Sequence, residues 1–397
     1  MLRARTAATT TTNLRNQQSV LAALLGLIFL ISAAKTFAQA PRSSTPRATG
    51  APVRVTELAR GLVHPWGLAA LPDGRFLVTE RPGRLRLVAR NGQLSKPLQG
   101  VPRVQAQGQG GLLDVTLDPD FARNGVLYLS YSEPGEGGVA GTAVARARLE
   151  NEALADVRVI YRQQPKVRGS GHFGSRIIFR RDGTLFITQG DRMSYKEQAQ
   201  DLASGLGKVV RVKADGSIPS DNPFIGRKEV RPEIWSYGHR NVQSAALHPT
   251  TGELWTIEHG ARGGDELNQP KAGRNYGWPV ITYGVDYSGA RIGEGTAKAG
   301  MEQPAFYWDP VIAPSGMIFY TGNVYPQWTG SIFVGSLAPG ALVRLTLQDG
   351  RVTREERYFE DLNERIREVA QGIDGRIYLL TDSSNGRILR LDPAAKK

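Results

Sequence analysis

The segment GSGHFGSRIIFRRDGTLFITQGDR, residues 169–192, contains two short apolar runs that are joined by an Arg-Asp-Gly turn. Runs of this kind, separated by a turn that ends in glycine, predict an antiparallel hairpin. His172 stands just before the first run, and Asp191 stands just after the second. Because a hairpin returns to the end at which it starts, we expect His172 and Asp191 to share one edge of the protein.

The same hairpin pattern recurs along the chain, with a glycine in each turn. Further apolar runs, such as GRLRLVAR (83–90) and GKVVRVKADG (207–216), follow several of the repeats. Small antiparallel sheets cannot bury both faces alone, but they can when they are stacked radially. The sequence therefore predicts an all-β fold, a six-bladed β-propeller with four-stranded antiparallel blades over residues 53–393. A β-sandwich is the alternative, although it does not explain the regular repetition. The repeats are GLAALPDGRFLVTE (67–80), LLDVTLDPDFARNGVLYLSY (112–131), RIIFRRDGTLFITQ (176–189), SAALHPTTGELWTIE (244–258), MIFYTGNVYPQWTGSIFVGS (317–336) and EVAQGIDGRIYLLT (368–381).

The composition is that of a globular protein with many turns. The chain has 397 residues, of which 40% are hydrophobic and 22% charged, with 46 glycines and 23 prolines. It has no cysteine, which excludes disulfides, thiolate metal sites and cysteine nucleophiles. The formal charge is +13, but lysines and arginines are scattered and no aromatic-basic run occurs, so we expect no nucleic-acid partner. The best short helix candidate is the segment 196–207.

Residues 1–40 have the pattern of a secretory signal peptide. Arg3, Arg5 and Arg15 precede the apolar run VLAALLGLIFLISAA, and Ala38-Gln39-Ala40 forms a small-x-small cleavage site. Residues 41–52 then read as a linker. We expect a periplasmic or secreted protein whose mature chain has no membrane span. An uncleaved membrane anchor is the alternative, but the apolar run is shorter than the ~20 residues that a span needs.

Unusual polar residues and glycines stand just before the first strand of each predicted blade. In a propeller these loops share one rim around the central channel, and so do the loops that leave the second strands. Large hydrogen-bonding side chains and glycines are typical of places where a backbone approaches a ligand. The segments are His64-Pro65-Trp66-Gly67, Gln109-Gly110-Gly111, Gly171-His172-Phe173-Gly174, Gly238-His239-Arg240-Asn241, Ala313-Pro314-Ser315-Gly316 and Arg365-Ile366-Arg367-Glu368.

The residue types on this rim suggest acid–base chemistry on an anionic ligand. A histidine oriented by an aspartate, as in His172 with Asp191, is a general base. Arg240, Arg365 and Arg367 offer planar forks for carboxylates or phosphates. A structural histidine, and surface ion pairs for the arginines, are the alternative interpretations.

A glycine-rich acidic stretch, GARGGDELN (260–268), follows the second strand of the fourth blade. Its carbonyls, together with Asp265, Glu266 and Asn268, could hold a hard cation such as Ca²⁺, although the spacing is not that of an EF-hand. The segment 261–312 is long for a propeller connection, and such insertions commonly carry function.

The motifs in every predicted blade resemble one known family, the soluble pyrroloquinoline-quinone (PQQ)-dependent aldose sugar dehydrogenases. This family includes the soluble quinoprotein glucose dehydrogenases and the sorbosone-dehydrogenase-like proteins. The resemblance extends over about residues 53–393. The motifs that carry it are HPWGLAALPDGRFLVTERPGRL (64–85), GQGGLLDVTLDPDF (108–121), GHFGSRIIF (171–179) with GDR (190–192), GHRNVQ (238–243), EHGARGGDELN (258–268), GRNYGWP (273–279), APSGM (313–317) and RIREV (365–369).

The resemblance implies that an aldose is oxidised to a lactone by hydride transfer to the quinone of PQQ, a cofactor with three carboxylates that sits on Ca²⁺. His172 matches the family's proton acceptor, and Asp191 lies where an acid supports it. Electrons would pass to an external acceptor, since the chain has no haem-attachment motif. The positions that match quinone-holding residues are Gln109, Arg240, Asn241, Arg365 and Arg367. The positions that match calcium sites are the backbone carbonyls of Gly260 and Ala261, and for a further ion Glu266 and the backbone of Tyr276.

One departure from the glucose dehydrogenase branch is visible. That branch has a lysine directed at the cofactor where this chain has Ala338-Pro339, so the cationic contact is missing or is supplied by another residue such as Arg344. The more permissive aldose-type branch therefore fits better. We expect an aldose substrate and a monomer or homodimer. The alternatives are a calcium-dependent propeller lactonase or hydrolase and a non-catalytic propeller that binds proteins or glycans.

Overall fold

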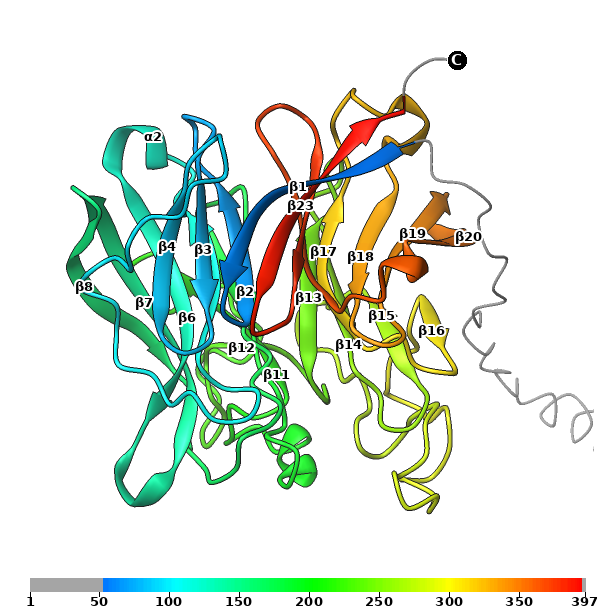
Figure 1. The fold of residues 1–397 in the computed structure, drawn as a ribbon. Coiled ribbons are helices and arrows are strands. Elements are labelled where there is room, and N and C mark those ends of the chain that lie inside the picture. Colours follow the sequence, from blue (N-terminus) through cyan, green and yellow to red (C-terminus); the bar gives the residue numbers. More distant parts are fainter. Residues whose placement is uncertain (1–52, 395–397) are drawn as a thin grey trace, which may run out of the picture. The chain divides into compact units, whose positions relative to one another are not determined.

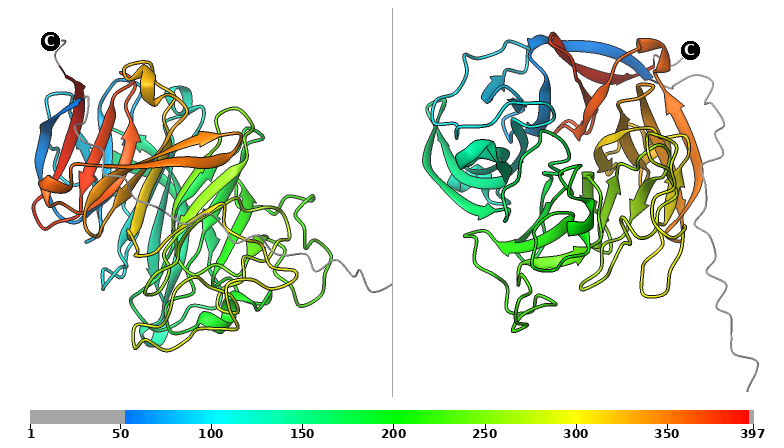
Figure 2. Two further views of the ribbon diagram at one scale, coloured as in Figure 1. Left: turned by 90° about the vertical axis from the view of Figure 1, so that its right-hand side faces the viewer. Right: turned by 90° about the horizontal axis from the view of Figure 1, so that it is seen from below.

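The computed structural model describes residues 53–394, and within this range nearly all regular structure is β-strand. Six antiparallel sheets are arranged radially, and the chain passes through them in sequence order (Figures 1 and 2). The predicted six-bladed propeller is thus confirmed. The predicted signal peptide and linker, residues 1–40 and 41–52, lie outside the described residues. Within residues 53–394 no helix is long and apolar enough to cross a membrane.

Each blade starts with its innermost strand and ends with its outermost. Blades 1 to 3 contain β2 (Pro65–Ala70), β3 (Phe76–Glu80) and β4 (Arg84–Val88); β5 (Leu112–Leu117), β6 (Val126–Pro134), β7 (Ala140–Glu150) and β8 (Ala153–Arg162); and β9 (Ile177–Phe179), β10 (Thr184–Thr188), β11 (Lys208–Lys213) and β12 (Ile234–Tyr237). Blades 4 to 6 contain β13 (Val242–Leu247), β14 (Leu254–Glu258), β15 (Asp265–Asn268) and β16 (Phe306–Trp308); β17 (Pro314–Phe319), β18 (Ile332–Ser336), β19 (Ala341–Gln348) and β20 (Arg351–Tyr358); and β21 (Ile366–Gln371), β22 (Ile377–Thr381), β23 (Gly386–Pro393) and β1 (Val53–Leu62).

The segment 169–192 forms the predicted hairpin between β9 and β10. Ile177 pairs with Ile187, and Phe179 pairs with Leu185. Gly183 in the turn has φ +78°, a conformation that glycine adopts without a Cβ clash. His172 and Asp191, which flank this hairpin, therefore return to the same end of the blade.

Blade 1 differs from the predicted four-stranded pattern, because only three of its strands are regular. The fourth position is taken by an irregular segment in which Leu94 bridges Val88 and the Leu98 N–H donates to the Leu85 carbonyl at 2.8 Å. Pro97 lies within this segment and has no N–H to donate, which is consistent with an outer-edge position.

The ring is closed by the first strand of the propeller. β1 forms the outermost strand of blade 6 and pairs with β23, with Val53 opposite Pro393 and Leu62 opposite Gly386. The two ends of the propeller chain thus belong to one sheet, as the blue and red strands show in Figure 1. This pairing contributes contacts between residues that are more than 300 positions apart, such as Thr56 Oγ1 and Asp392 Oδ2 at 2.7 Å.

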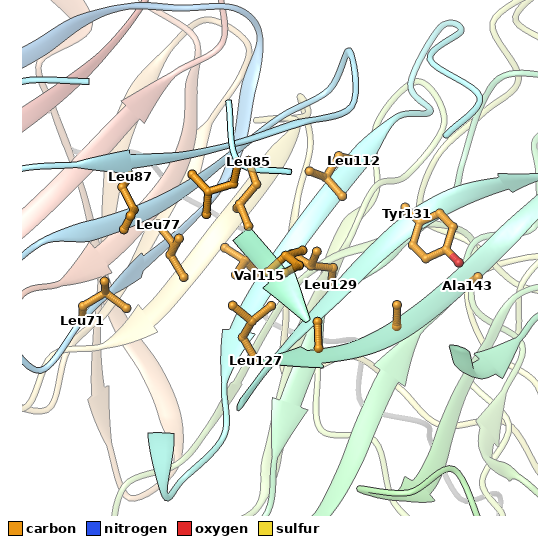
Figure 3. Packing of buried hydrophobic residues seen from close by; sticks show 14 residues of the cluster. Leu71, Leu77, Leu85, Leu87, Leu112, Val115, Leu127, Leu129, Tyr131 and Ala143 are labelled. Carbon is orange, nitrogen blue, oxygen red and sulfur yellow. The ribbon is translucent and has the colours of Figure 1, made fainter. Parts of the chain in front are cut away.

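The hydrophobic core consists of layers between adjacent blades rather than one central cluster. Figure 3 shows the layer between blades 1 and 2, where Leu77 and Leu85 face Leu112, Val115 and Leu127. Strands that are covered on both faces read as nearly continuous apolar runs, which is why the repeats were recognisable in the sequence.

Helical structure is limited to single turns. They are α2 (Phe121–Asn124) and the 3₁₀ turns η1 (Glu136–Gly138), η2 (Lys196–Ala199), η3 (Pro326–Trp328) and η4 (Glu360–Leu362). The predicted helix over 196–207 was therefore wrong beyond its first turn. The buried Lys208 ammonium explains this, because it donates hydrogen bonds to the carbonyls of Gln198, Ala199 and Leu206 and so holds those groups inward instead of along a helix axis.

Candidate active site

The loops before the innermost strands meet at one end of the propeller, which we call the mouth. They are joined by hydrogen bonds between neighbouring blades. Gln109, in the loop before β5, accepts from the His172 N–H at 2.8 Å, and Asn241 Oδ1 accepts from the Gly174 N–H at 3.1 Å. His64, before β2, lies 3.2 Å from Asp382, which follows β22. The predicted rim residues thus lie in contacting loops.

His172 and Asp191 form a buried pair at the mouth. His172 Nδ1 lies 2.6 Å from Asp191 Oδ1, and the two residues are 4% and 0% exposed. Since the carboxylate accepts, Nδ1 carries the hydrogen and Nε2 keeps its lone pair. Among the described residues no protein group bonds Nε2. The arrangement leaves His172 with a free acceptor nitrogen, as a general base requires.

Burial lowers the pKa of His172 below the usual 6.5. The bond and charge of Asp191 oppose this effect, while the positive charges of Arg240 and Arg192 add to it. The imidazole is therefore neutral at neutral pH, which is the state that accepts a proton.

Arg240 lies beside this pair on the loop between β12 and β13. It is 5% exposed, and its Nη1 donates to the carbonyls of His259 (3.1 Å) and Gly260. Its Nε is buried without a partner, and so is Nδ2 of the adjacent Asn241. Unpaired buried donors are costly in a folded protein, so both are available for an acceptor on a ligand.

Arg365 and Arg367 reach the mouth from the start of blade 6. Arg367 is buried and donates to Gln243 Oε1 at 2.9 Å and to Asp382 Oδ2 at 2.8 Å, while its Nε has no partner. Arg365 has a half-exposed side chain and donates to the Leu337 carbonyl at 3.1 Å. The two arginines thus differ, one being fixed and the other open to solvent.

Asp382 is an acid of the mouth that sequence reasoning missed. Its carboxylate lies 3.5 Å from Arg81 and is also bound by His64 and Arg367. Burial alone would raise the pKa of Asp382, but the charge and hydrogen bonds of Arg367, with Arg81 and His64, hold it well below its usual range. A signal was present in the sequence, because Asp382 follows the second strand of its blade as Asp191 does.

The glycine turn between β14 and β15 crowds backbone carbonyls together. A Cβ on Gly260 would lie 2.2 Å from the Gly263 carbonyl oxygen, so only glycine fits there, and Ala261 and Gly263 form an isolated bridge. The Gly260 carbonyl accepts from the Arg240 guanidinium, so it faces a place that already holds positive charge. Within residues 53–394 no group of three or more His, Asp or Glu side chains is poised to hold a metal.

Asp265 does not face this turn as a free ligand, which corrects one interpretation of GARGGDELN. Its two oxygens accept the N–H groups of Gly260 (2.8 Å), Ile312 (2.8 Å) and Ala313 (2.9 Å). Backbone N–H groups at the glycine turn and before β17 therefore use the acceptor capacity of Asp265. Asp265 therefore stabilises the glycine turn through these backbone hydrogen bonds and is not free to bind a cation.

A cavity of about 10 Å³ lies behind the turn and is lined by Glu258, Glu266 and Tyr276 among others. This volume suits a single water or ion. Burial and the nearby charge of Glu258 raise the pKa of Glu266 well above its usual value. Asn268 donates to both carboxylates, at 3.0 and 3.3 Å, and its Oδ1 has no partner. The buried Glu258 and the partly buried Glu266 beside a small cavity are a donor set that a hard cation would stabilise.

Arg344, one residue that could have supplied the missing cationic contact, does not reach the mouth. Its guanidinium is bound by Glu356 (2.8 Å), Ser331 (2.9 Å) and the Gln327 carbonyl (2.7 Å). Ser331 and Gln327 belong to the turn at the opposite end of blade 5. Ala338 is exposed at the mouth. The positively charged side chain next to its loop is that of Arg365, which donates to the neighbouring Leu337 carbonyl.

Sequence reasoning assigned no role to Trp278, although it belongs to the motif GRNYGWP (273–279). It lies in the long segment between β15 and β16, and its Nε1 donates to Asp191 Oδ2 at 2.8 Å. No repeat pattern covers this segment, so the position of the indole could not be deduced from blade symmetry.

Fold and site together define a class of protein, the propeller enzymes whose reactive side chains face the central channel. Residues 62–390 match the glucose/sorbosone dehydrogenase family. The chain belongs to this family of sugar dehydrogenases, which confirms the predicted resemblance.

Similar proteins support the same assignment. Aldose sugar dehydrogenase YliI of Escherichia coli is 47% identical over 356 residues, which cover 88% of this chain and 96% of the relative. The structure of the soluble E. coli aldose sugar dehydrogenase in its apo-form is similar with a TM-score of 0.84, covering 86% of this chain and all of the other. The PQQ-bound aldose sugar dehydrogenase of Streptomyces coelicolor is 29% identical, with a TM-score of 0.72 and coverage of 88% and 100%.

Proposed function

We propose that this protein oxidises aldose sugars to lactones in a reaction that depends on PQQ and Ca²⁺ and passes electrons to an external acceptor. The observation that carries the proposal is the pair of His172 and Asp191, which presents a neutral imidazole at the same mouth as the arginine forks. The PQQ-bound structure of a relative supports the choice of cofactor.

The residues at the mouth fit a cofactor that carries several carboxylates. Arg240 Nε, Asn241 Nδ2 and Arg367 Nε are buried donors without partners. Together with the exposed Gln109 and Arg365 they would hold such a group, because guanidinium forks bind carboxylates in two-point fashion. The net charge of the mouth also suits an anionic cofactor, because Asp382 neutralises only part of the positive charge of the arginines around it.

The donor set at the glycine turn fits a hard cation. The carbonyls of Gly260 and Ala261 would bind Ca²⁺, which prefers oxygen ligands, and Glu266 with the Tyr276 backbone would bind a second ion. Arg240 would give up its bond to the Gly260 carbonyl when the first ion binds. When bound, PQQ supplies a hydride acceptor and Ca²⁺ polarises it.

The chain's own groups would handle the proton. His172 Nε2 accepts the proton of the sugar hydroxyl, while Asp191 fixes the Nδ1–H tautomer and stabilises the imidazolium that results. Gln109 holds the backbone N–H of His172 and keeps the ring at the mouth. We further propose a periplasmic or secreted location and a monomer or homodimer.

Reconstitution tests the proposal. Purified apo-protein is given PQQ and Ca²⁺, and reduction of an artificial dye is followed with a panel of aldoses. We expect turnover that requires both additions. His172→Ala should lower kcat by about 10²- to 10⁴-fold, while quinone binding, followed by absorbance titration, stays within a few-fold of the wild type.

A matched histidine serves as the control. His248 lies in the turn between β13 and β14, at the end opposite the mouth, so His248→Ala should leave turnover unchanged. Lactone hydrolysis without quinone would indicate the propeller lactonase instead. Bound quinone with no oxidation of any sugar would overturn the proposal in favour of a binding module.

A further inference from the structure

Trp278 is buried in the long connection between β15 and β16 and reaches the histidine–aspartate pair from outside its blade. The indole is 7% exposed, and its Nε1 donates to Asp191 Oδ2 at 2.8 Å. Asp191 Oδ1 accepts from His172 Nδ1 at 2.6 Å and from the Met193 N–H at 2.7 Å. With donors on both oxygens the carboxylate cannot rotate, so Oδ1 stays directed at His172.

The same indole contacts the arginine side of the mouth. The guanidinium carbon of Arg240 lies 5.2 Å from the centroid of the Trp278 ring, within the range of a cation–π interaction. One side chain therefore touches both the partner of the proton acceptor and an arginine of the proposed quinone site.

The backbone around Trp278 explains how a residue from a long connection reaches a defined position. The Trp278 N–H donates to the Gly238 carbonyl at 2.9 Å, and its own carbonyl accepts from Gln200 Nε2 at 2.7 Å. The Tyr276 N–H donates to the Tyr237 carbonyl at 2.8 Å. These bonds fasten the connection to the end of blade 3. One of them is made at Gly238, which lies two residues before Arg240.

We propose that Trp278 is a positioning residue. It orients Asp191 so that His172 presents Nε2 to the substrate, and its ring also holds the Arg240 guanidinium in place. This inference rests on the proposed function for its catalytic meaning. Its structural content, the coupling of the indole to the histidine–aspartate pair, can be tested on the apo-protein.

Trp278→Phe separates the two contacts, because it keeps an aromatic ring under Arg240 and removes the N–H. Loss of a hydrogen bond to a charged group should lower kcat by about 10- to 100-fold, with quinone affinity within a few-fold of the wild type. Trp235→Phe is the matched control, since the Trp235 indole donates to the Pro270 carbonyl at 3.0 Å and makes no bond to Asp191. It should change neither quantity.

The titration of His172 in the apo-protein gives a readout that does not need activity. The groups that face the ring are Asp191, Arg192 and Arg240, and His259 is nearby. Without the indole donor, the Asp191 carboxylate keeps more negative charge for the imidazolium. The pKa of His172, measured by ¹⁵N NMR, should therefore rise in Trp278→Phe and stay unchanged in Trp235→Phe.

A wild-type measurement covers the case in which the variant does not fold. The indole N–H of Trp278 should exchange slowly, and its resonance should shift with the titration of His172. Failure of that resonance to respond, or an unchanged His172 titration in a folded Trp278→Phe protein, overturns the inference. If the titrations respond but no sugar is oxidised with PQQ and Ca²⁺, the proposed function fails and the coupling stands.

Discussion

His172 has a backbone conformation that few non-glycine residues adopt. Its φ is +48°, and its carbonyl lies so close to Gly190 that a Cβ there would be 2.1 Å from the oxygen. Such strain persists only where surrounding contacts determine the backbone, here the bond from the His172 N–H to Gln109. With this backbone conformation the imidazole bonds Asp191, and the glycine at 190 leaves room for the His172 carbonyl.

The lowered pKa of His172 predicts the acid side of the pH profile. As the proposed base, His172 must be neutral, so kcat/KM should fall only as the pH drops through its folded-state pKa, which lies below 6.5. Asp191 raises that pKa, so Asp191→Asn should move the acid limb to still lower pH while it reduces kcat. Steady-state kinetics with a saturating acceptor would check this, and an acid limb above pH 6.5 in the wild type would contradict it.

At this scale the sequence predicts residues that follow blade symmetry and misses those that do not. His172 and Asp191 flank a hairpin, so their meeting follows from strand geometry alone. Trp278 comes from an irregular connection, and its position depends on tertiary hydrogen bonds. Arg344 was one possible source of the missing cationic contact, but strand β19 carries it past the mouth to the opposite end of blade 5.

Among the elements, β1 is the strand that closes the ring. It supplies the outer strand of blade 6, and Leu62 at its end is fully buried in the layer between blades 6 and 1. The turn signals predicted the hairpins within blades. They carried no information on this pairing, because its two strands lie at opposite ends of the sequence.

Leu62→Ala should therefore destabilise the propeller. Removal of a fully buried leucine side chain costs about 2–5 kcal/mol through lost burial and the cavity left behind. Arg54→Ala, at an exposed position of the same strand, should change the free energy of unfolding by less than about 0.5 kcal/mol. Urea denaturation of both variants measures the difference, and equal midpoints would show that β1 does not hold the ring.

Across the whole molecule, all six innermost strands or the loops just before them meet at one charged cluster inside the channel. Arg176, just before β9, bonds Asp114 of β5 (3.3 Å) and Glu368 of β21. Its Nε donates to the Gln243 carbonyl of β13 at 2.7 Å, and its guanidinium stacks 4.1 Å from the Trp66 ring of β2. The fifth blade contributes Gly316, which packs directly against the Glu368 carboxylate. A Cβ at this position would lie 1.9 Å from Glu368 Oε1, so only glycine leaves room for the acid.

This cluster holds two acids against one base. Burial raises the pKa of Asp114 and raises that of Glu368 to about 7. Since the folded-state pKa of Glu368 exceeds the ordinary 4.5, its contribution to stability is full below pH 4.5 and is lost as the pH rises through about 7. The sequence contained these residues in its first-strand motifs, but their convergence on one arginine required the closed ring.

Two substitutions distinguish the charges of the cluster at pH 8. Arg176→Met leaves two buried carboxylates without their cation and should cost about 3–5 kcal/mol. Glu368→Gln mimics the protonated acid and leaves Arg176 paired with Asp114, so it should equal or exceed the wild type in stability. Chemical denaturation at pH 6 and pH 8 tests both, and a Glu368→Gln variant as unstable as Arg176→Met would contradict this account.

The pairing of Val53 with Pro393 has a practical consequence. β1 runs from Val53 toward His64 at the mouth, so both ends of the propeller chain emerge side by side on the opposite face. An electrode linker or fusion partner attached at either end of the propeller would leave the mouth open. A short peptide could also join the two ends, with new termini cut at the exposed Asp182-Gly183 turn, to give a circular permutant in which blade 3 is assembled from the two new ends of the chain.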